Sequence, residues 1–158
     1  MSGGRSLAAW LGVATLAAIS TCAPLAPASG QPARLQHGPA VTIGEVGTQV
    51  GGNRTGRALH RALVEELSAL GGVRLSGPVG ARYVLRGSVT RLERRQVERD
   101  LEVRCEVSLV LSDARGNVRA MLSGRAGARG GGDAQHVERV AMQAAVRGAL
   151  RPLPGSLH

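Results

Sequence analysis

The chain has 158 residues, enough for one ordinary domain and too few for a large multidomain enzyme. It carries 20 basic and 11 acidic side chains, a formal net charge of +9, and every basic residue is arginine. Because high-GC codon usage adds arginine wherever a solvated cation is tolerated, this charge alone does not predict an anionic partner. The only aromatic residues are Trp10 and Tyr83, which excludes the stacking platforms that bind single-stranded nucleic acids.

Residues 1–28 have the pattern of a signal peptide. A short segment with Arg5 precedes an apolar stretch from Leu7 to Ile19, and small residues and prolines follow from Ala23 to Ala28. The apolar stretch is shorter than the roughly 20 residues that a membrane-spanning helix needs. We therefore expect an exported protein, either periplasmic, anchored to the outer membrane or secreted, with no transmembrane helix in its mature form.

Two processing routes remain open for this signal peptide. Cleavage after Ala28 would release a free protein. Alternatively, Ile19-Ser20-Thr21-Cys22 resembles a bacterial lipobox, in which the cysteine is acylated and becomes the new amino terminus. In both cases Cys105 is the only other cysteine, so no internal disulfide is expected.

The remaining chain reads as a flexible tether over residues 29–40, a single domain over 41–152 and a tail over 153–158. The domain begins with a candidate strand, Val41 to Val46. A helix follows, for which Thr55 is a candidate N-cap and Gly71-Gly72 a stop signal. Its predicted buried stripe recurs at helical spacing and consists of Leu59, Leu63, Leu67 and Leu70.

Four further strands are predicted after this helix. Val73 to Ser76 is short, and Arg82 to Leu92 is longer, with one face formed by Tyr83, Leu85, Gly87 and Val89. Leu101 to Ser112 alternates strictly between apolar and polar residues, which is typical of an antiparallel strand buried on one side. A turn at Asp113–Asn117 connects this strand to the next one, Val118 to Ala126. The inner-face residues of that strand become smaller along it and allow close approach of another element.

The last element is a helix that Asp133 caps and that Arg151-Pro152 ends. Its predicted buried stripe consists of Val137, Val140, Ala141, Ala144, Ala145 and Gly148. The order β-α-β-β-β-β-α predicts an α+β fold, a mostly antiparallel sheet of about four to five strands with two helices packed on one face.

The segment from Val41 to Leu92 resembles a group of bacterial envelope proteins, most clearly in the strand Ala81 to Val89. The group comprises the amino-terminal domain of the Tol translocation protein, the penicillin-binding-protein activator lipoproteins and the curli-secretion lipoprotein. The resemblance implies an α+β domain at a periplasmic or outer-membrane-anchored address. It also implies a binding or assembly role with an envelope partner, and it carries over no catalytic residue.

No catalytic, metal or cofactor site is predicted from the remaining motifs. The glycine-rich segment 47–55 precedes a helix as a phosphate-binding loop would, but Asn53 stands where such a loop has lysine, so we interpret it as a connecting loop. Cys105 lies on the apolar face of the best strand, which predicts a buried thiol. His60 and His136 lack further ligands at metal-binding spacing, and Glu65 and Glu66 point in different directions on a helix.

The one basic cluster in the sequence consists of Arg82, Arg86, Arg91, Arg94, Arg95 and Arg99. We expect residues 94–99 to connect the two long strands. Either this connection is a solvated turn with interspersed glutamates, or the cluster contacts an anionic envelope surface or an acidic protein through its guanidinium groups.

These observations predict a non-enzymatic binding or assembly module of the bacterial cell envelope, either as a lipoprotein or as a free protein. The alternative is a secreted protein that binds an anionic polymer or a membrane surface through the arginine cluster. Nucleic acid is not an expected partner.

Overall fold

The computed structural model describes residues 38–157. The signal peptide, Cys22 and most of the tether lie outside the described residues. The elements in chain order are β1 (Ala40–Thr48), α1 (Gly52–Ala69), β2 (Arg74–Leu75), β3 (Tyr83–Val97), β4 (Asp100–Asp113), β5 (Val118–Gly130), α2 (Ala134–Leu150) and the 3-10 helix η1 (Leu153–Ser156). This order confirms the predicted α+β fold.

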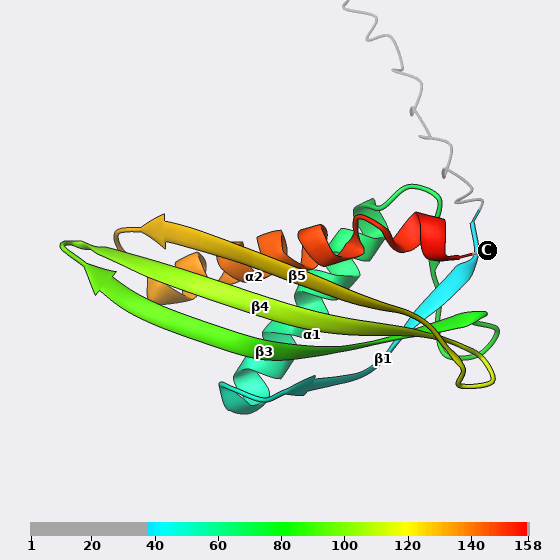
Figure 1. Ribbon diagram of the computed structural model, residues 1–158. Helices are drawn as coiled ribbons and strands as arrows, with labels where there is room; N and C mark the ends of the chain where they lie inside the picture. Colours follow the sequence, from blue (N-terminus) through cyan, green and yellow to red (C-terminus); the bar gives the residue numbers. More distant parts are fainter. Residues whose placement is uncertain (1–37, 158) are drawn as a thin grey trace, which may run out of the picture. The chain divides into compact units, whose positions relative to one another are not determined.

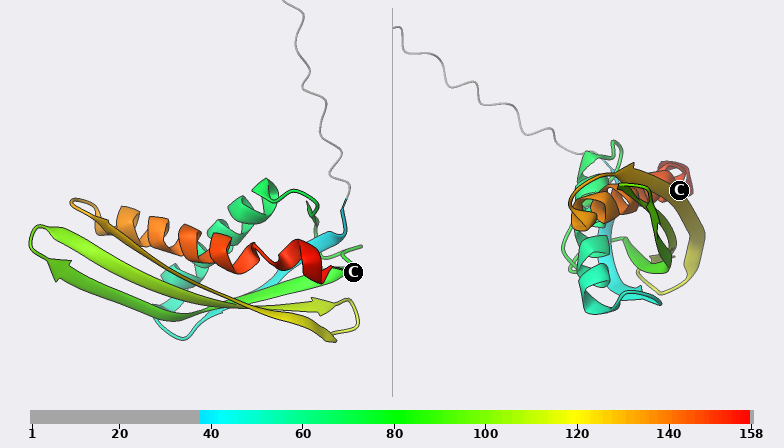
Figure 2. Two further views of the ribbon diagram at one scale, coloured as in Figure 1. Left: turned by 45° about the horizontal axis from the view of Figure 1, so that its top comes forward. Right: turned by 90° about the vertical axis from the view of Figure 1, so that its left-hand side faces the viewer.

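The five strands form one curled sheet in the order β2-β1-β3-β4-β5, with both helices on the same face (Figures 1 and 2). β1 is parallel to β2 and β3, whereas β3, β4 and β5 are antiparallel neighbours. The sheet is therefore mixed; the long antiparallel ladders of β3, β4 and β5 make up most of it, as predicted, and β1 adds two parallel pairings. The parallel pairs arise because α1 carries the chain back across the sheet after β1.

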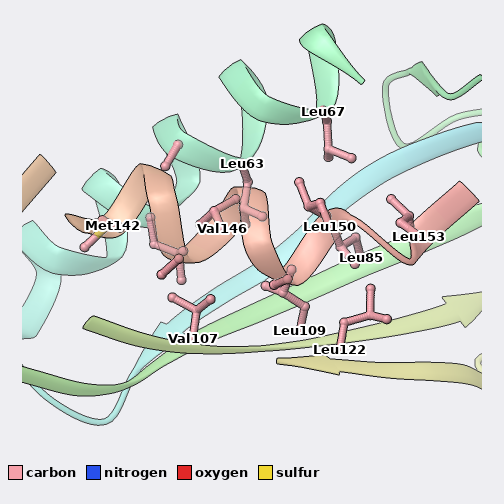
Figure 3. Close-up of a cluster of buried hydrophobic side chains, with 14 of the residues drawn as sticks. Leu63, Leu67, Leu85, Val107, Leu109, Leu122, Met142, Val146, Leu150 and Leu153 are labelled. Carbon is pink, nitrogen blue, oxygen red and sulfur yellow. The ribbon is translucent and has the colours of Figure 1, made fainter. Parts of the chain in front are cut away.

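The hydrophobic core lies between the sheet and the helices (Figure 3). The predicted inner face of β3 is buried, and β4 buries the alternating residues that the sequence pattern indicates. From α1, the core receives the stripe Leu59, Leu63 and Leu67, all with no exposed surface, and Leu70 packs against its margin. α1 ends at Ala69, directly before the predicted glycine stop signal.

α2 begins where the sequence predicts, because the Asp133 carboxylate accepts a hydrogen bond from the Gln135 amide at 2.9 Å. Its buried stripe is rotated relative to the prediction. Val140 is 41% exposed and Gly148 is exposed, so their predicted burial is wrong. The observed stripe is Val137, Ala141, Met142, Ala145, Val146, Ala149 and Leu150.

The two long strands extend further than the sequence predicts. β3 continues to Val97 and β4 begins at Asp100, so residues 94–97 are strand, and only Glu98 and Arg99 connect the two. Glu98 has a positive φ of 56°, as such a tight turn requires. Likewise, β5 continues through the glycine-rich stretch to Gly130. Pairing with β4 keeps these residues extended although their local sequence favours a loop.

The residues after Pro152, expected as a tail, form the short helix η1 and add to the core. Leu153 has no exposed surface and Leu157 is 7% exposed. Within residues 38–157, no helix combines the length and the apolar character that crossing a membrane requires.

Candidate functional site

A groove of about 540 Å³ lies between the N-terminal halves of α1 and α2. Both helices lie on the same face of the sheet (Figure 1). The groove contains five arginines and two glutamates, namely Arg54, Arg57, Arg61, Arg94, Arg139, Glu65 and Glu138. Its more buried lining residues are small or flexible and comprise Thr55, Ala58, Ala62 and Met142.

Both glutamates of this groove are already engaged. Glu138 of α2 pairs with Arg94 of β3 at 2.5 Å, and this hydrogen bond raises the pKa of Arg94. Glu65 of α1 accepts a hydrogen bond from the Gln143 amide of α2. Among the described residues, Arg54, Arg57, Arg61 and Arg139 have no carboxylate within 4 Å. The groove therefore has a net positive charge that residues 38–157 leave unneutralised.

The start of α1 adds to this positive character. Gly51, with φ 88°, is the N-cap, so the prediction of Thr55 as the cap is wrong. The Thr55 hydroxyl lies inside the helix and donates to the Gly51 carbonyl at 3.0 Å. No side chain caps the first turn, and no acidic residue lies in it. The positive end of the helix dipole is therefore not compensated by a side chain.

The opposite face of the sheet carries charges of alternating sign. Across β3, β4 and β5, the outward-facing rows are Arg91–Glu106–Arg125, Glu93–Arg104–Gly127 and Arg95–Glu102–Arg129. Ion pairs join Arg125 to Glu106 at 2.8 Å and Arg104 to Glu102 at 3.0 Å. Such cross-strand alternation neutralises neighbouring charges on an exposed surface.

The structure separates the arginines of the predicted cluster. Arg91 and Arg95 lie in the alternating rows of the outer face, and Arg94 points to the other face, where it pairs with α2. Arg82 lies over the Tyr83 ring at 5.6 Å, Arg86 lies on the outer face, and Arg99 is in the turn. Of the six, only Arg94 lines the interhelical groove.

Sequence reasoning missed the other groove arginines. Arg54, Arg57 and Arg61 are separated by three and four residues on α1, so they share one side of the helix. That spacing could have indicated a basic stripe once the helix had been predicted. Arg139 comes from α2, and only the packing of the two helices places it in the same groove.

A second candidate surface is the free edge of the sheet. β5 is a terminal strand of 13 residues and pairs only with β4 within residues 38–157. Two large apolar side chains on it are exposed, Met121 by 76% and Val118 by 60%. Met121 is next to half-buried Val110 of β4, which extends the apolar surface. An unpaired strand edge is a template for pairing with another chain.

Cys105 is a buried thiol, as predicted. Burial raises its pKa from 9.0 to about 11, and the nearby Glu106 carboxylate acts in the same direction. Neighbouring carboxylates also have arginine partners, since Glu66 pairs with Arg147 of α2 at 2.8 Å. On the outer face of β4, Glu102 pairs with Arg104 and Glu106 with Arg125. In the part of the chain that the structure covers, no group of three or more His, Cys, Asp or Glu side chains is arranged to hold a metal ion.

No protein-family model and no curated protein matches this chain. Among solved structures, the PelC dodecamer from Paraburkholderia phytofirmans is 21% identical, with a TM-score of 0.58 over 75% of this chain and 90% of that one. A hypothetical protein from Chlamydia trachomatis is 9% identical, with a TM-score of 0.60 over 76% and 98%. A minor lipoprotein from Acinetobacter baumannii is 17% identical, with a TM-score of 0.51 over 73% and 92%.

None of these three bears the name of the Tol, penicillin-binding-protein activator or curli proteins, so the specific resemblance seen in the sequence stays a prediction. At such identities the likeness concerns the backbone arrangement. The described domain has the α+β fold that these three bacterial proteins share.

Proposed function

We propose that this protein is an exported, non-enzymatic binding or assembly module of the bacterial cell envelope. Its first residues have the pattern of a signal peptide, and Cys22 stands at a lipobox-like position. Two proteins with its fold support the same address and role, since one is a minor lipoprotein and another is a dodecamer. The anchor would be a lipid on Cys22, or else the protein is free in the periplasm or secreted.

The observation that carries the proposal is the exposed edge of β5. The strand has 13 residues, and its outer edge offers unpaired backbone N–H and C=O groups. Natural proteins usually protect such an edge, and proteins that bind by strand addition leave it open. Met121 and Val118 add exposed apolar side chains at one end of the strand. We assign this surface to contact with an envelope protein or with another copy of the chain.

Site-specific photo-crosslinking in the native host tests this proposal. A photoreactive amino acid is introduced in separate strains at Met121, at Val118 and, as a control, at Ser68, which is exposed on α1 in the helix layer. Contact through β5 predicts one adduct of defined mass from Met121 in the envelope fraction and none from Ser68. Mass spectrometry then shows whether the adduct contains an envelope protein or a second copy of this chain.

The proposal is wrong if positions 118 and 121 both give no adduct while the protein is present in the envelope. It is equally wrong if the protein fractionates with the cytoplasm. A further variant, Met121→Glu, places a charge at the contact and should remove the adduct from position 118.

The alternative function, binding of an anionic polymer or membrane surface, is favoured by a different observation, the positive groove.

A further inference from the structure

The groove between α1 and α2 gathers arginines that have no acidic partner among residues 38–157. On the outer face of the sheet, four arginines have a carboxylate within 4 Å, whereas Arg86 and Arg95 have none among the described residues; the four are Arg91, Arg104, Arg125 and Arg129. In the groove, Arg54, Arg57, Arg61 and Arg139 have none among the described residues. What distinguishes the groove is that these four unpaired arginines come from two helices and line one cavity.

The placement of these arginines is unfavourable for the free protein. Arg57 follows Arg54 by three residues and Arg61 follows Arg57 by four, so like charges are neighbours on the helix surface. Arg54 also lies in the first turn of α1, at the positive end of the helix dipole, where an acidic residue would be stabilising. An anion bound in the groove would relieve both repulsions at once.

From these contacts we infer that the groove binds an organic phosphate through Arg54, Arg57, Arg61 and Arg139. A phosphate group has several oxygens directed to different sides and can accept hydrogen bonds from guanidinium groups on two helices. A single carboxylate has two oxygens in one plane and matches one guanidinium best.

The size and lining of the groove indicate that the phosphate carries an organic part. A volume of about 540 Å³ lies in the range of small-molecule sites and exceeds what one phosphate group fills. Ala58, Ala62 and Met142 give the groove apolar lining beneath the charged rim, and methionine adapts its shape to a ligand. The phosphate would therefore belong either to a soluble ester or to a lipid headgroup.

This site is separate from the β5 edge, so the two proposals can fail independently. The groove lies among the helices and Arg94, whereas Met121 and Val118 belong to the terminal strand of the sheet. Loss of phosphate binding should leave the Met121 crosslink unchanged.

The test compares two double variants of the full chain, processed by its bacterial host. Arg61→Gln with Arg139→Gln removes one groove arginine from each helix. The matched control, Arg86→Gln with Arg95→Gln, removes two exposed arginines from the outer face. All four positions are exposed, so both variants should retain the wild-type circular dichroism spectrum.

Binding is measured with two probes, glycerol 1-phosphate by calorimetry and vesicles containing phosphatidylglycerol by co-sedimentation. We expect the groove variant to bind about tenfold more weakly or worse, because it loses two charge-assisted contacts, and the control to stay within about twofold. Binding of glycerol 1-phosphate alone would identify a soluble ligand. Binding of the vesicles alone would identify a lipid headgroup. Both results would support the proposed site.

Three results would overturn the inference. The first is that the wild-type protein binds neither probe. The second is that both double variants weaken binding equally, which would indicate diffuse charge attraction over the whole surface. The third is that citrate binds as tightly as glycerol 1-phosphate, which would show that the groove does not select phosphate.

Discussion

Arginine side chains in this chain act differently according to the surface that holds them. On the outer face they alternate with glutamates and contribute about 0–1 kcal/mol per exposed pair. Arg147 joins the helices, because it pairs with Glu66 of α1 from the last turn of α2. In the interhelical groove Arg94 pairs with Glu138, whereas the other four arginines have no carboxylate within 4 Å among residues 38–157, and Arg139 contacts the His136 ring at 2.9 Å.

A second residue-scale property concerns the buried thiol of Cys105. Its pKa is about 11 in the folded protein, compared with 9.0 when the thiol is solvated. The unfolded chain therefore loses this proton first as the pH rises. Below pH 9 the thiol is protonated in both states and contributes no pH dependence. Between about pH 9 and pH 11 ionisation favours the unfolded state, by up to about 2–3 kcal/mol.

Substitution of Cys105 by alanine should remove this alkaline loss of stability. We expect the free energy of unfolding of the wild-type protein to fall more steeply between pH 9 and pH 11 than that of Cys105→Ala. At pH 7 the variant should be less stable, because it leaves a small cavity in the core. Denaturant unfolding at several pH values measures both effects, and parallel pH profiles would show that the thiol does not titrate as described.

At the scale of elements, close packing of α2 against β5 depends on one glycine. A Cβ atom on Gly124 would lie 2.0 Å from the Ala145 carbonyl oxygen and 2.9 Å from the Ala149 Cβ. The sequence predicts that the inner-face residues of β5 become smaller along the strand and allow another element to pack closely. The structure identifies that element as α2. The same contact explains the small residues in the buried stripe of α2, since larger ones would separate helix and strand.

Two glycine-to-alanine substitutions test this packing. Gly124→Ala should destabilise the protein by about 2–3 kcal/mol, because backbone atoms of α2 block the added methyl group. Gly148→Ala, on the exposed side of α2, has open space around its Cβ and should stabilise the protein by about 0.5–1 kcal/mol through helix propensity. Thermal or urea unfolding measures both, and equal tolerance at the two positions would contradict the observed contact.

At the scale of the whole molecule, the fold places different surfaces on different sides. The helices cover one face of the sheet (Figure 2). They line the positive groove, and the other face of the sheet carries exposed charged side chains. β5 is the terminal strand on one side of the sheet, and its outer edge is unpaired within residues 38–157. This arrangement allows a protein contact at the edge and an anion in the groove at the same time.

The expected cellular localisation of the protein differs between the two processing routes of its amino terminus. We expect the mature protein from its native host to begin either at Cys22 with acyl chains or at Ser29 without them. Intact-mass spectrometry distinguishes the two. If the protein is acylated, Cys22→Ala removes the acylated thiol and should shift the protein from the membrane fraction to the soluble fraction. A mature protein that retains Met1 in the cytoplasm would contradict export altogether.

Much of the local structure follows from the sequence because its signals are local. Periodic leucines predict α1, strict alternation predicts β4, and Asp133 predicts the start of α2. The turn after β4 is another example, since the Asp113 carboxylate accepts from the Arg115 and Asn117 amides and Gly116 has φ 89°. Each of these features involves residues close together in the chain, where spacing alone determines the geometry.

Features that depend on distant residues do not follow from the sequence in this way. The strand extension to Val97 and Gly130 comes from pairing with β4, and α2 buries the side that packs against β4, β5 and α1. The predicted arginine cluster joins residues that are close in sequence, but alternate strand positions and the β3 bulge direct them to opposite faces.

The sequence by itself therefore determined the order of elements, the α+β class and the burial of Cys105, because each depends on composition or short-range periodicity. Only the tertiary structure decided that the sheet is mixed, that β5 is left as an edge and that Arg139 joins Arg54, Arg57 and Arg61 in one groove. These features depend on which elements pack together, and that choice is made by contacts between residues far apart in the chain.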